Sequence, residues 1–356
     1  MSLDAQRNSV LERLQKAMDL ELATIPPYMM ALMSIRPPAN RPAADLIRSV
    51  MMEEMLHMAL VGNLICSLGG RTRLGKENVP SYPLRMTFQN RNFSDRKFDI
   101  ELRGLTPTQL EVFLKIELPA DLHEAFGLQA EGLVVPAPTI GDFYDDLVKD
   151  LRAMATTYPE KDVFIGADAP QIGPGYYWGG AGETTVVRTL DDALTALGVI
   201  IRQGEGASIA MAAGEFQYFA DPKNHGHYFR FMEIARGRRY KVEDSPMGNP
   251  SGELISTDFG ACAVLKANPR AADYAAGTPL LTLNSAFNRH YSLMLNQMEL
   301  AFNGNPTLLY EAITNGMHGL AGIAYQIVRT PVPDEVGVFG CPSFEWVEQV
   351  SGNVNP

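Results

Sequence analysis

Acidic and imidazole side chains in this sequence stand at positions where a helix would place core residues. Apolar residues recur at steps of three and four along three long segments, which predicts amphipathic helices. These segments are residues 3–35, 43–68 and 189–215. One stripe contains Glu21, the second contains Glu54 and His57, and the third contains Glu205. Burying a carboxylate without a partner is costly, and a bound cation removes that cost. The chain is therefore expected to bring these acids together.

A fourth helix is predicted from Asp221, a capping residue followed by proline, to about Ala235. Its stripe includes Asn224 and His227, so the four helices supply Glu, Glu-x-x-His, Glu and Asn-x-x-His in that order. Carboxylate bundles that bind two iron or manganese ions use a Glu from two helices and Glu-x-x-His from the other two. Oxygen and imidazole ligands suit these metals. We predict these metal ligands: Glu21, Glu54, His57, Glu205, His227 and Asn224.

Asn224 departs from this pattern, because it stands where a fourth Glu is expected. Three carboxylates leave one positive charge of two divalent ions uncompensated, and an amide bridges two metals poorly. The number and identity of the metal ions therefore stay open: one or two iron ions, or manganese. A mononuclear site on Glu54, His57 and a neighbouring Glu is one of these alternatives. Three nearby groups are weaker candidates, namely His225 and Glu233 as substitute ligands and Glu53 as a solvated or supporting residue.

Tyr28 is predicted to approach the metals as a catalytic residue. It lies seven residues after Glu21, on roughly the same helical face. Packing within the core is the alternative explanation for this aromatic side chain. The pair Pro26–Pro27, just before it, is expected to kink the first helix or to end its first half.

The remainder of the chain divides into segments that differ in composition and periodicity. Residues 71–187 are rich in Pro, Gly and aromatics, with two strand-like stretches and two shorter helices at Leu84–Phe88, Phe98–Leu102, Thr106–Ile116 and Ile140–Thr156. A helical hairpin is predicted at 284–303 and 306–328, and a wrapping tail follows it. We predict a metal-binding bundle from 1–70 with 188–236, an insertion or lid at 71–187, and a C-terminal part at 237–356, all packed as one unit.

Composition excludes several classes of function. The chain has 30 Lys and Arg against 41 Asp and Glu, a net charge of −11, which argues against nucleic acid and anionic membranes as partners. Its three cysteines form no CxxC motif, so a disulfide framework and a thiolate zinc site are not expected. The sequence shows neither a secretory signal nor an apolar run long enough to span a membrane. We expect a cytoplasmic protein, and a homo-oligomer stays open.

Several stretches resemble the ferritin-like proteins that share the iminophenyl-pyruvate dimer synthase domain, which are related to enzymes of violacein and rebeccamycin assembly. The resemblance extends over about residues 1–345. The stretches are Leu20–Tyr28, Glu53–Met58, Thr139–Tyr144, Arg202–Gly206, His227–Ile234, Phe287–Tyr291 and Phe302–Gly304. The resemblance implies a mainly α fold, a ferritin-like four-helix bundle with a mixed α/β insertion and extra C-terminal helices. It also implies a metal site on Glu21, Glu54, His57, Glu205 and His227.

The function expected from these residues and this resemblance is that of a non-haem iron or manganese carboxylate protein. Such a protein would be an oxidoreductase that uses O2 to oxidise a small molecule, such as an amino acid or its imine, in secondary metabolism. Two alternatives stay open. One is a non-catalytic ferritin-like metal-binding protein with a degenerate or mononuclear site, and the other is a hydrolase with one metal and water.

Overall fold

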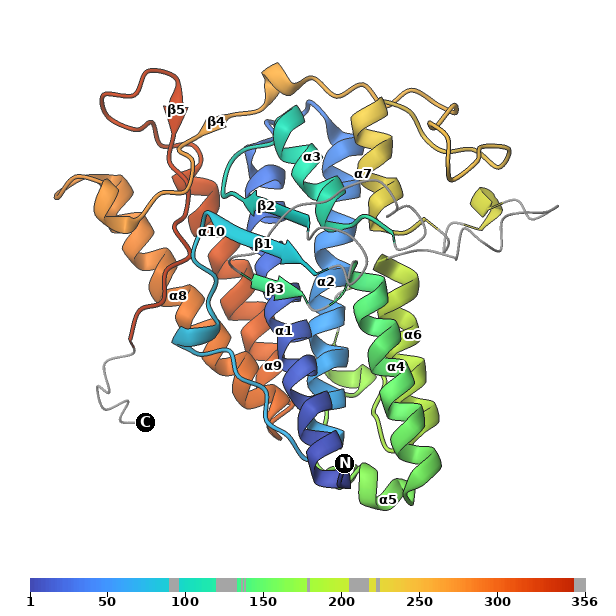
Figure 1. Ribbon diagram of the computed structural model, residues 1–356. Helices are drawn as coiled ribbons and strands as arrows, with labels where there is room; N and C mark the ends of the chain where they lie inside the picture. Colours follow the sequence, from blue (N-terminus) through green and yellow to red (C-terminus); the bar gives the residue numbers. More distant parts are fainter. Residues whose placement is uncertain are drawn as a thin grey trace.

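The fold is mainly helical and is seen here in a computed structural model (Figure 1). The structure describes residues 1–89, 96–119, 133–135, 137, 139–177, 180–204, 218–221 and 225–348, and the statements below concern these residues. The expectation of a mainly α fold is confirmed.

The two longest helices at the N-terminus form an antiparallel hairpin, α1 (Leu3–Ser34) and α2 (Arg41–Ser67). Ser2 caps the first helix by accepting a hydrogen bond from the amide of Ala5. The second helix ends before Gly69, whose φ of 76° is a left-handed conformation that favours glycine. Both helices match the segments predicted from sequence periodicity.

The proline pair does not end α1, which continues through Pro26 and Pro27 to Ser34. A proline nitrogen cannot donate to the carbonyl one turn earlier, so Pro27 leaves the carbonyl of Ala23 without its helical partner. The hydroxyl of Tyr82 donates to this carbonyl at 2.7 Å. A tertiary contact therefore replaces the missing hydrogen bond.

Two further helices complete a bundle with α1 and α2, as Figure 1 shows. They are α4 (Ile140–Thr157), which packs on α1 and α6, and α6 (Leu190–Gly204), which packs on α2. The segment 71–187, predicted to be an insertion, thus supplies a helix of the bundle itself. The division of the chain into three parts stays a prediction.

One end of the bundle is covered by a second layer. Here α3 (Pro107–Ile116) packs on α7 (His227–Arg236), and α7 packs on α2. The sequence prediction that the latter helix begins at Asp221 is wrong, because Gly226 has an extended backbone and the helix begins at His227. A nearby sheet has the order β2-β1-β3, formed by β1 (Leu84–Phe88), β2 (Arg96–Ile100) and β3 (Leu133–Val135). β1 pairs with β2 antiparallel and with β3 parallel.

The C-terminal helices pack against the other side of α2. They are α8 (Pro279–Phe302), α9 (Leu308–Glu311), a π-helical turn (Ala312–Met317) and α10 (His318–Ile327). Gly62 allows the close approach of α8, because a Cβ there would lie 3.0 Å from the ring of Phe302. Short elements lie at α5 (Glu160–Val163), β4 (Val264–Leu265), β5 (Val338–Phe339) and in 3-10 turns at Lys76–Asn78, Pro174–Tyr176, Tyr218–Ala220, Phe259–Ala261 and Ala271–Asp273.

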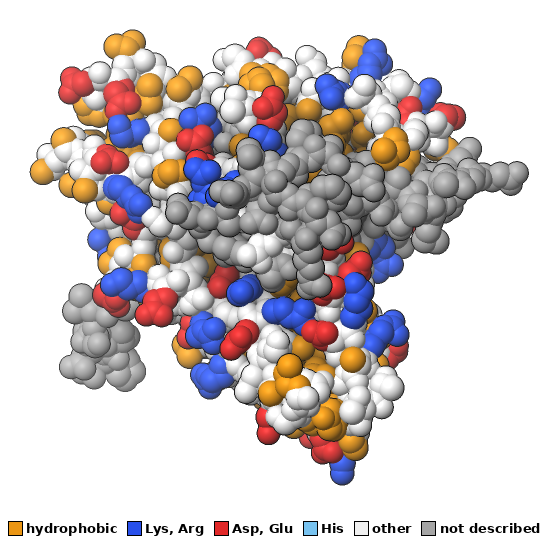
Figure 2. Space-filling model, in the orientation of Figure 1, with side chains coloured by type: hydrophobic (Ala, Val, Ile, Leu, Met, Phe, Trp, Pro, Cys, Tyr) orange, Lys and Arg blue, Asp and Glu red, His pale blue; other side chains and the backbone are white. Residues whose placement is uncertain are grey.

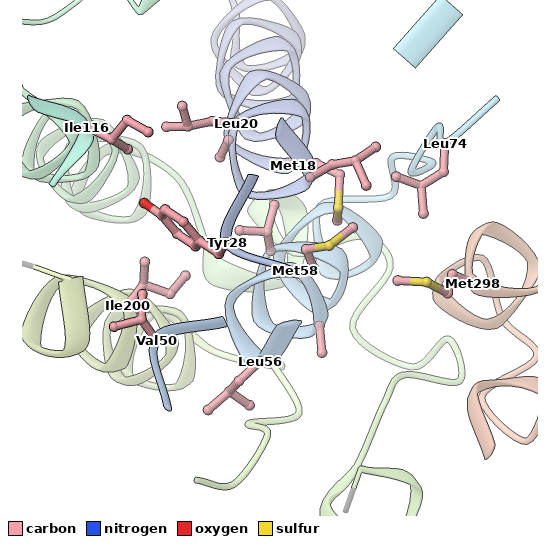
Figure 3. Close-up of a cluster of buried hydrophobic side chains, with 14 of the residues drawn as sticks. Met18, Leu20, Tyr28, Val50, Leu56, Met58, Leu74, Ile116, Ile200 and Met298 are labelled. Carbon is pink, nitrogen blue, oxygen red and sulfur yellow. The ribbon is translucent and has the colours of Figure 1, made fainter. Parts of the chain in front are cut away.

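The core is apolar and rich in methionine where the helices meet. In Figure 3, Met18 and Met58 lie close together, with Met298 of α8 nearby. Met18 and Met58 are fully buried. Acidic and basic side chains are interspersed on the face shown in Figure 2. Among the described helices, none combines the length and apolar character needed to cross a bilayer.

Candidate metal centre

Four of the six predicted ligands lie together inside the bundle, and all are almost fully buried. They are Glu21 of α1, Glu54 and His57 of α2, and His227 at the start of α7. The other two, Glu205 and Asn224, lie outside the described residues.

A first triad joins α1 to α2. The Nδ1 atom of His57 lies 3.6 Å from Oε2 of Glu21 and 3.3 Å from Oε2 of Glu54. These ligand-type atoms all lie within 4.8 Å of one another. The i, i+3 spacing of Glu54 and His57 places both on one face of α2, toward α1.

A second triad uses Glu117, a residue that the sequence analysis did not single out. The Nδ1 atom of His227 lies 3.0 Å from Oε1 of Glu54 and 3.3 Å from Oε2 of Glu117, which directly follows α3. The ligand-type atoms of Glu54, Glu117 and His227 also all lie within 4.8 Å of one another. Glu117 continues the buried stripe of Leu110 and Phe113, so the signal that identified the other acids was present here too.

The two triads are adjacent because Glu54 belongs to both. Its Oε2 atom faces the first triad and its Oε1 atom faces the second. Metal–ligand distances of about 2.0–2.2 Å place neighbouring ligand atoms roughly 3 Å apart, close to the separations found here. This donor set of three carboxylates and two imidazoles therefore fits two neighbouring divalent ions, with Glu54 between them.

Both histidines are oriented by a partner behind the imidazole ring. The Nε2 atom of His57 lies 3.0 Å from Oε1 of Gln203, whose own amide nitrogen donates to the carbonyl of Ala181. The Nε2 atom of His227 lies 3.0 Å from Oε2 of Glu53. In each case the outer nitrogen donates its proton, so Nδ1 faces the carboxylates, which is the usual orientation of a metal-binding histidine.

Two tyrosines hold the outer carboxylate oxygens. The hydroxyl of Tyr144 donates to Oε1 of Glu21, and the hydroxyl of Tyr28 donates to Oε1 of Glu117. Both tyrosines are fully buried, and burial raises their pKa well above the usual value, so they remain donors. The catalytic role expected for Tyr28 stays a prediction, and its contact is that of a residue positioning Glu117.

Without a cation the cluster retains protons. Burial raises the pKa of Glu21, and the charge of Glu54 raises it further, to about 8. Burial lowers the pKa of His57, but hydrogen bonds and charges from Glu21 and Glu54 outweigh burial and raise it to about 10. Burial likewise opposes the charge on His227, but the carboxylates of Glu117 and Glu54 hold its pKa well above the usual value. These protons compete directly with a metal for the same atoms.

A small cavity opens onto both triads. It is lined by all five of these side chains and by residues of α4 and α6, including Ile140, Tyr144, Ile200 and Gly204. Its volume is about 20 Å³, roughly the room that one water-sized molecule needs. The walls beyond the carboxylates are mostly apolar.

The weaker candidates lie elsewhere or support a ligand. Glu53 holds His227, as expected of a supporting residue. Glu233 is buried but accepts hydrogen bonds from Arg239 and from the amide of Tyr240. His225 packs edge-on against Phe219. Neither Glu233 nor His225 is part of the two triads.

Comparison with known proteins agrees with this architecture. A family model described as Ferritin-like matches residues 14–236, so the chain belongs to the ferritin-like family. A crystal structure of a ferritin-like protein from Caulobacter vibrioides has the same fold, with a TM-score of 0.58 and 21% identity. The similarity covers 94% of this chain and 97% of that chain. No protein with a curated description matches this sequence. The matched segment contains both triads.

Proposed function

We propose that this protein is a non-haem di-iron oxidoreductase that uses O2 to oxidise a small organic molecule. The observation that carries the proposal is the division of the Glu54 carboxylate between two triads of buried ligands. Structural ion pairs rarely require three carboxylates and two imidazoles in one buried cluster, because the uncompensated charge is costly. Two divalent cations would offset that charge.

Five side chains would hold the metals. Glu21 and His57 would bind one ion, Glu117 and His227 the other, and Glu54 would bridge them. Glu205 and Asn224 remain predicted ligands in addition to these five. With Glu117, the set of Glu21, Glu54 and the predicted Glu205 gains a fourth carboxylate, so a dinuclear site does not depend on Asn224. Manganese fits the same donor atoms.

Iron bound there would supply O2 activation and the electron transfers that protein side chains cannot perform. The chain's own residues would fix the ligand geometry and exclude bulk water from a buried cavity. Tyr28 and Tyr144 would hold the outer carboxylate oxygens in place. The apolar walls favour a small substrate, and the resemblance to the iminophenyl-pyruvate dimer synthase domain suggests an amino acid or its imine.

Metal content and O2 uptake test this proposal. We expect protein from iron-supplemented cells, or protein loaded anaerobically with Fe²⁺, to hold about two iron ions per chain and to consume O2. Glu54→Gln should abolish binding of at least one ion. Glu12→Gln, an exposed acid on α1, is the matched control and should bind normally.

Two results would contradict the proposal. Absence of bound transition metal in wild-type protein would overturn the metal centre. Two bound ions with no O2 uptake would exclude the oxidase and favour the alternative of a ferritin-like metal-binding protein without catalysis.

A further inference from the structure

We propose that the two metal positions are unequal, and that the position formed by Glu117 and His227 binds a divalent ion more tightly and fills first. This inference rests on the proposed dinuclear centre. It concerns the order and strength of loading, which the ligand set alone does not determine.

The immediate ligands of the two positions are nearly equivalent. Each has one imidazole Nδ1 atom, one carboxylate held by a tyrosine, and one oxygen of Glu54. The ligand-type atoms are separated by similar distances in both triads. Within the part of the chain that the structure describes, a difference in affinity must therefore come from the groups behind these ligands.

The difference among the described residues lies behind the two imidazoles. The outer nitrogen of His57 donates to a neutral amide, Gln203, whereas that of His227 donates to a carboxylate, Glu53. A carboxylate attracts the imidazole proton more strongly than an amide does, which increases the electron density on the opposite nitrogen. His227 is therefore the stronger donor to a metal.

Glu53 is fixed in this role by Arg230. One oxygen of Glu53 faces His227, and the other accepts a hydrogen bond from Nη1 of Arg230 at 2.9 Å. Arg230 is held in turn by Ser49 and by the carbonyl of His225.

Anaerobic titration of the metal-free protein with Co²⁺, followed by visible absorption and calorimetry, tests the order of loading. We expect two binding steps whose affinities differ by about tenfold or more. His57→Ala should keep the tight step, and His227→Ala should keep the weak one. Two equal steps, or the reverse assignment, would overturn the inference.

Isosteric variants that retain every ligand give a second, independent test. Glu53→Gln should weaken the tight step by about 10- to 100-fold, and Gln203→Glu should strengthen the weak step. The exposed control Glu12→Gln should change neither step. A tight step that is unaffected by Glu53→Gln refutes the inference while the dinuclear centre stands. Failure of wild-type protein to bind any Co²⁺ refutes the centre itself.

Discussion

At the scale of single residues, each histidine and each terminal carboxylate of the candidate centre has one polar atom that points away from the centre, and this atom is hydrogen-bonded to a neighbouring side chain. Gln203 and Glu53 bind the outer nitrogens of the histidines, and two tyrosines bind the outer oxygens of the terminal carboxylates. The inner atoms are left facing one another within a few ångströms. Groups that orient a ligand typically contribute to metal affinity almost as clearly as the ligand itself.

The two tyrosines provide a direct test of this orienting role. Tyr28→Phe removes the hydroxyl that holds Glu117 but keeps the ring that packs on Phe113 and Phe231. We expect the affinity of the second position for Co²⁺ to fall about tenfold, with the first position unchanged. Tyr144→Phe should have the opposite selectivity, because its hydroxyl holds Glu21.

The exposed Tyr176 supplies the control for this pair, because Tyr176→Phe removes the same hydroxyl from a side chain that belongs to neither triad. The Co²⁺ titration of Tyr176→Phe should match that of the wild-type protein. If Tyr28→Phe and Tyr144→Phe both leave the two steps unchanged, the tyrosines are packing residues. Turnover that is lost from Tyr28→Phe with metal binding intact would instead support the catalytic role expected from sequence.

Most of the described cluster could be identified from sequence, and the reason is physical. An acid on an apolar stripe is costly to bury, so Glu21 and Glu54 stood out, as did His57 three residues later. Glu117 carries the same signal at the end of a shorter helix, but the expected four-helix pattern assigns the fourth carboxylate to the position of Asn224. Periodicity reports which face of a helix is buried, and it does not report which distant helix that face meets.

At the scale of secondary-structure elements, α1 depends on a contact from outside the helix. The hydroxyl of Tyr82 satisfies the Ala23 carbonyl, which Pro27 leaves without a partner, within two residues of Glu21. Tyr82→Phe removes this bond and leaves a buried carbonyl unsatisfied. We expect the free energy of unfolding to fall by about 1–3 kcal/mol, measured by urea denaturation.

The control for Tyr82→Phe is the same substitution at an exposed tyrosine. Tyr176→Phe should change the free energy of unfolding by less than about 0.5 kcal/mol, because that side chain is exposed. A Tyr82→Phe protein as stable as wild type would mean that water or a local adjustment satisfies the carbonyl of Ala23.

Helices were easier to predict than their boundaries and neighbours. The periodic segments at α1 and α2 were correct to within two residues, whereas α7 begins six residues after the predicted cap. The helix α4 was expected from its pattern and from Thr139, which caps it by accepting from the amide of Asp142. That it packs on α1 and α6 could not be expected, because packing partners far apart in sequence leave no local pattern.

At the scale of the whole molecule, the net charge of −11 includes acids that do not face solvent. Glu21, Glu54 and Glu117 are almost fully buried around one point inside the bundle. Metal-free protein must keep protons on this cluster, and metal-bound protein must release them. Folding, metal binding and pH are therefore linked in this chain.

The sign of this linkage follows from the shifted pKa values. The pKa of Glu21 rises from 4.5 to about 8 on folding, and that of His57 rises from 6.5 to about 10. A raised pKa in the folded state gives stability that is complete below the unfolded value and is lost as pH rises through the folded value. Metal-free protein should therefore lose stability as pH rises from about 4.5 to about 10, with Glu21 responsible for the lower part of this range and His57 for the upper part. Glu54, whose pKa is lowered to about 2, affects stability only at acid pH below this window.

Metal binding should show the opposite trend, because a metal replaces the protons that these groups otherwise retain. We expect the increase in melting temperature caused by Mn²⁺, relative to protein in EDTA, to grow between about pH 6 and pH 8.5. Calorimetry in buffers of different ionisation enthalpy should also show protons released on binding. The control Glu12→Gln should follow wild type, whereas Glu54→Gln should show a much smaller increase at every pH. A metal-induced increase that shrinks as pH rises, or binding without proton release, would show that the buried acids and histidines are not the groups that hold the ion.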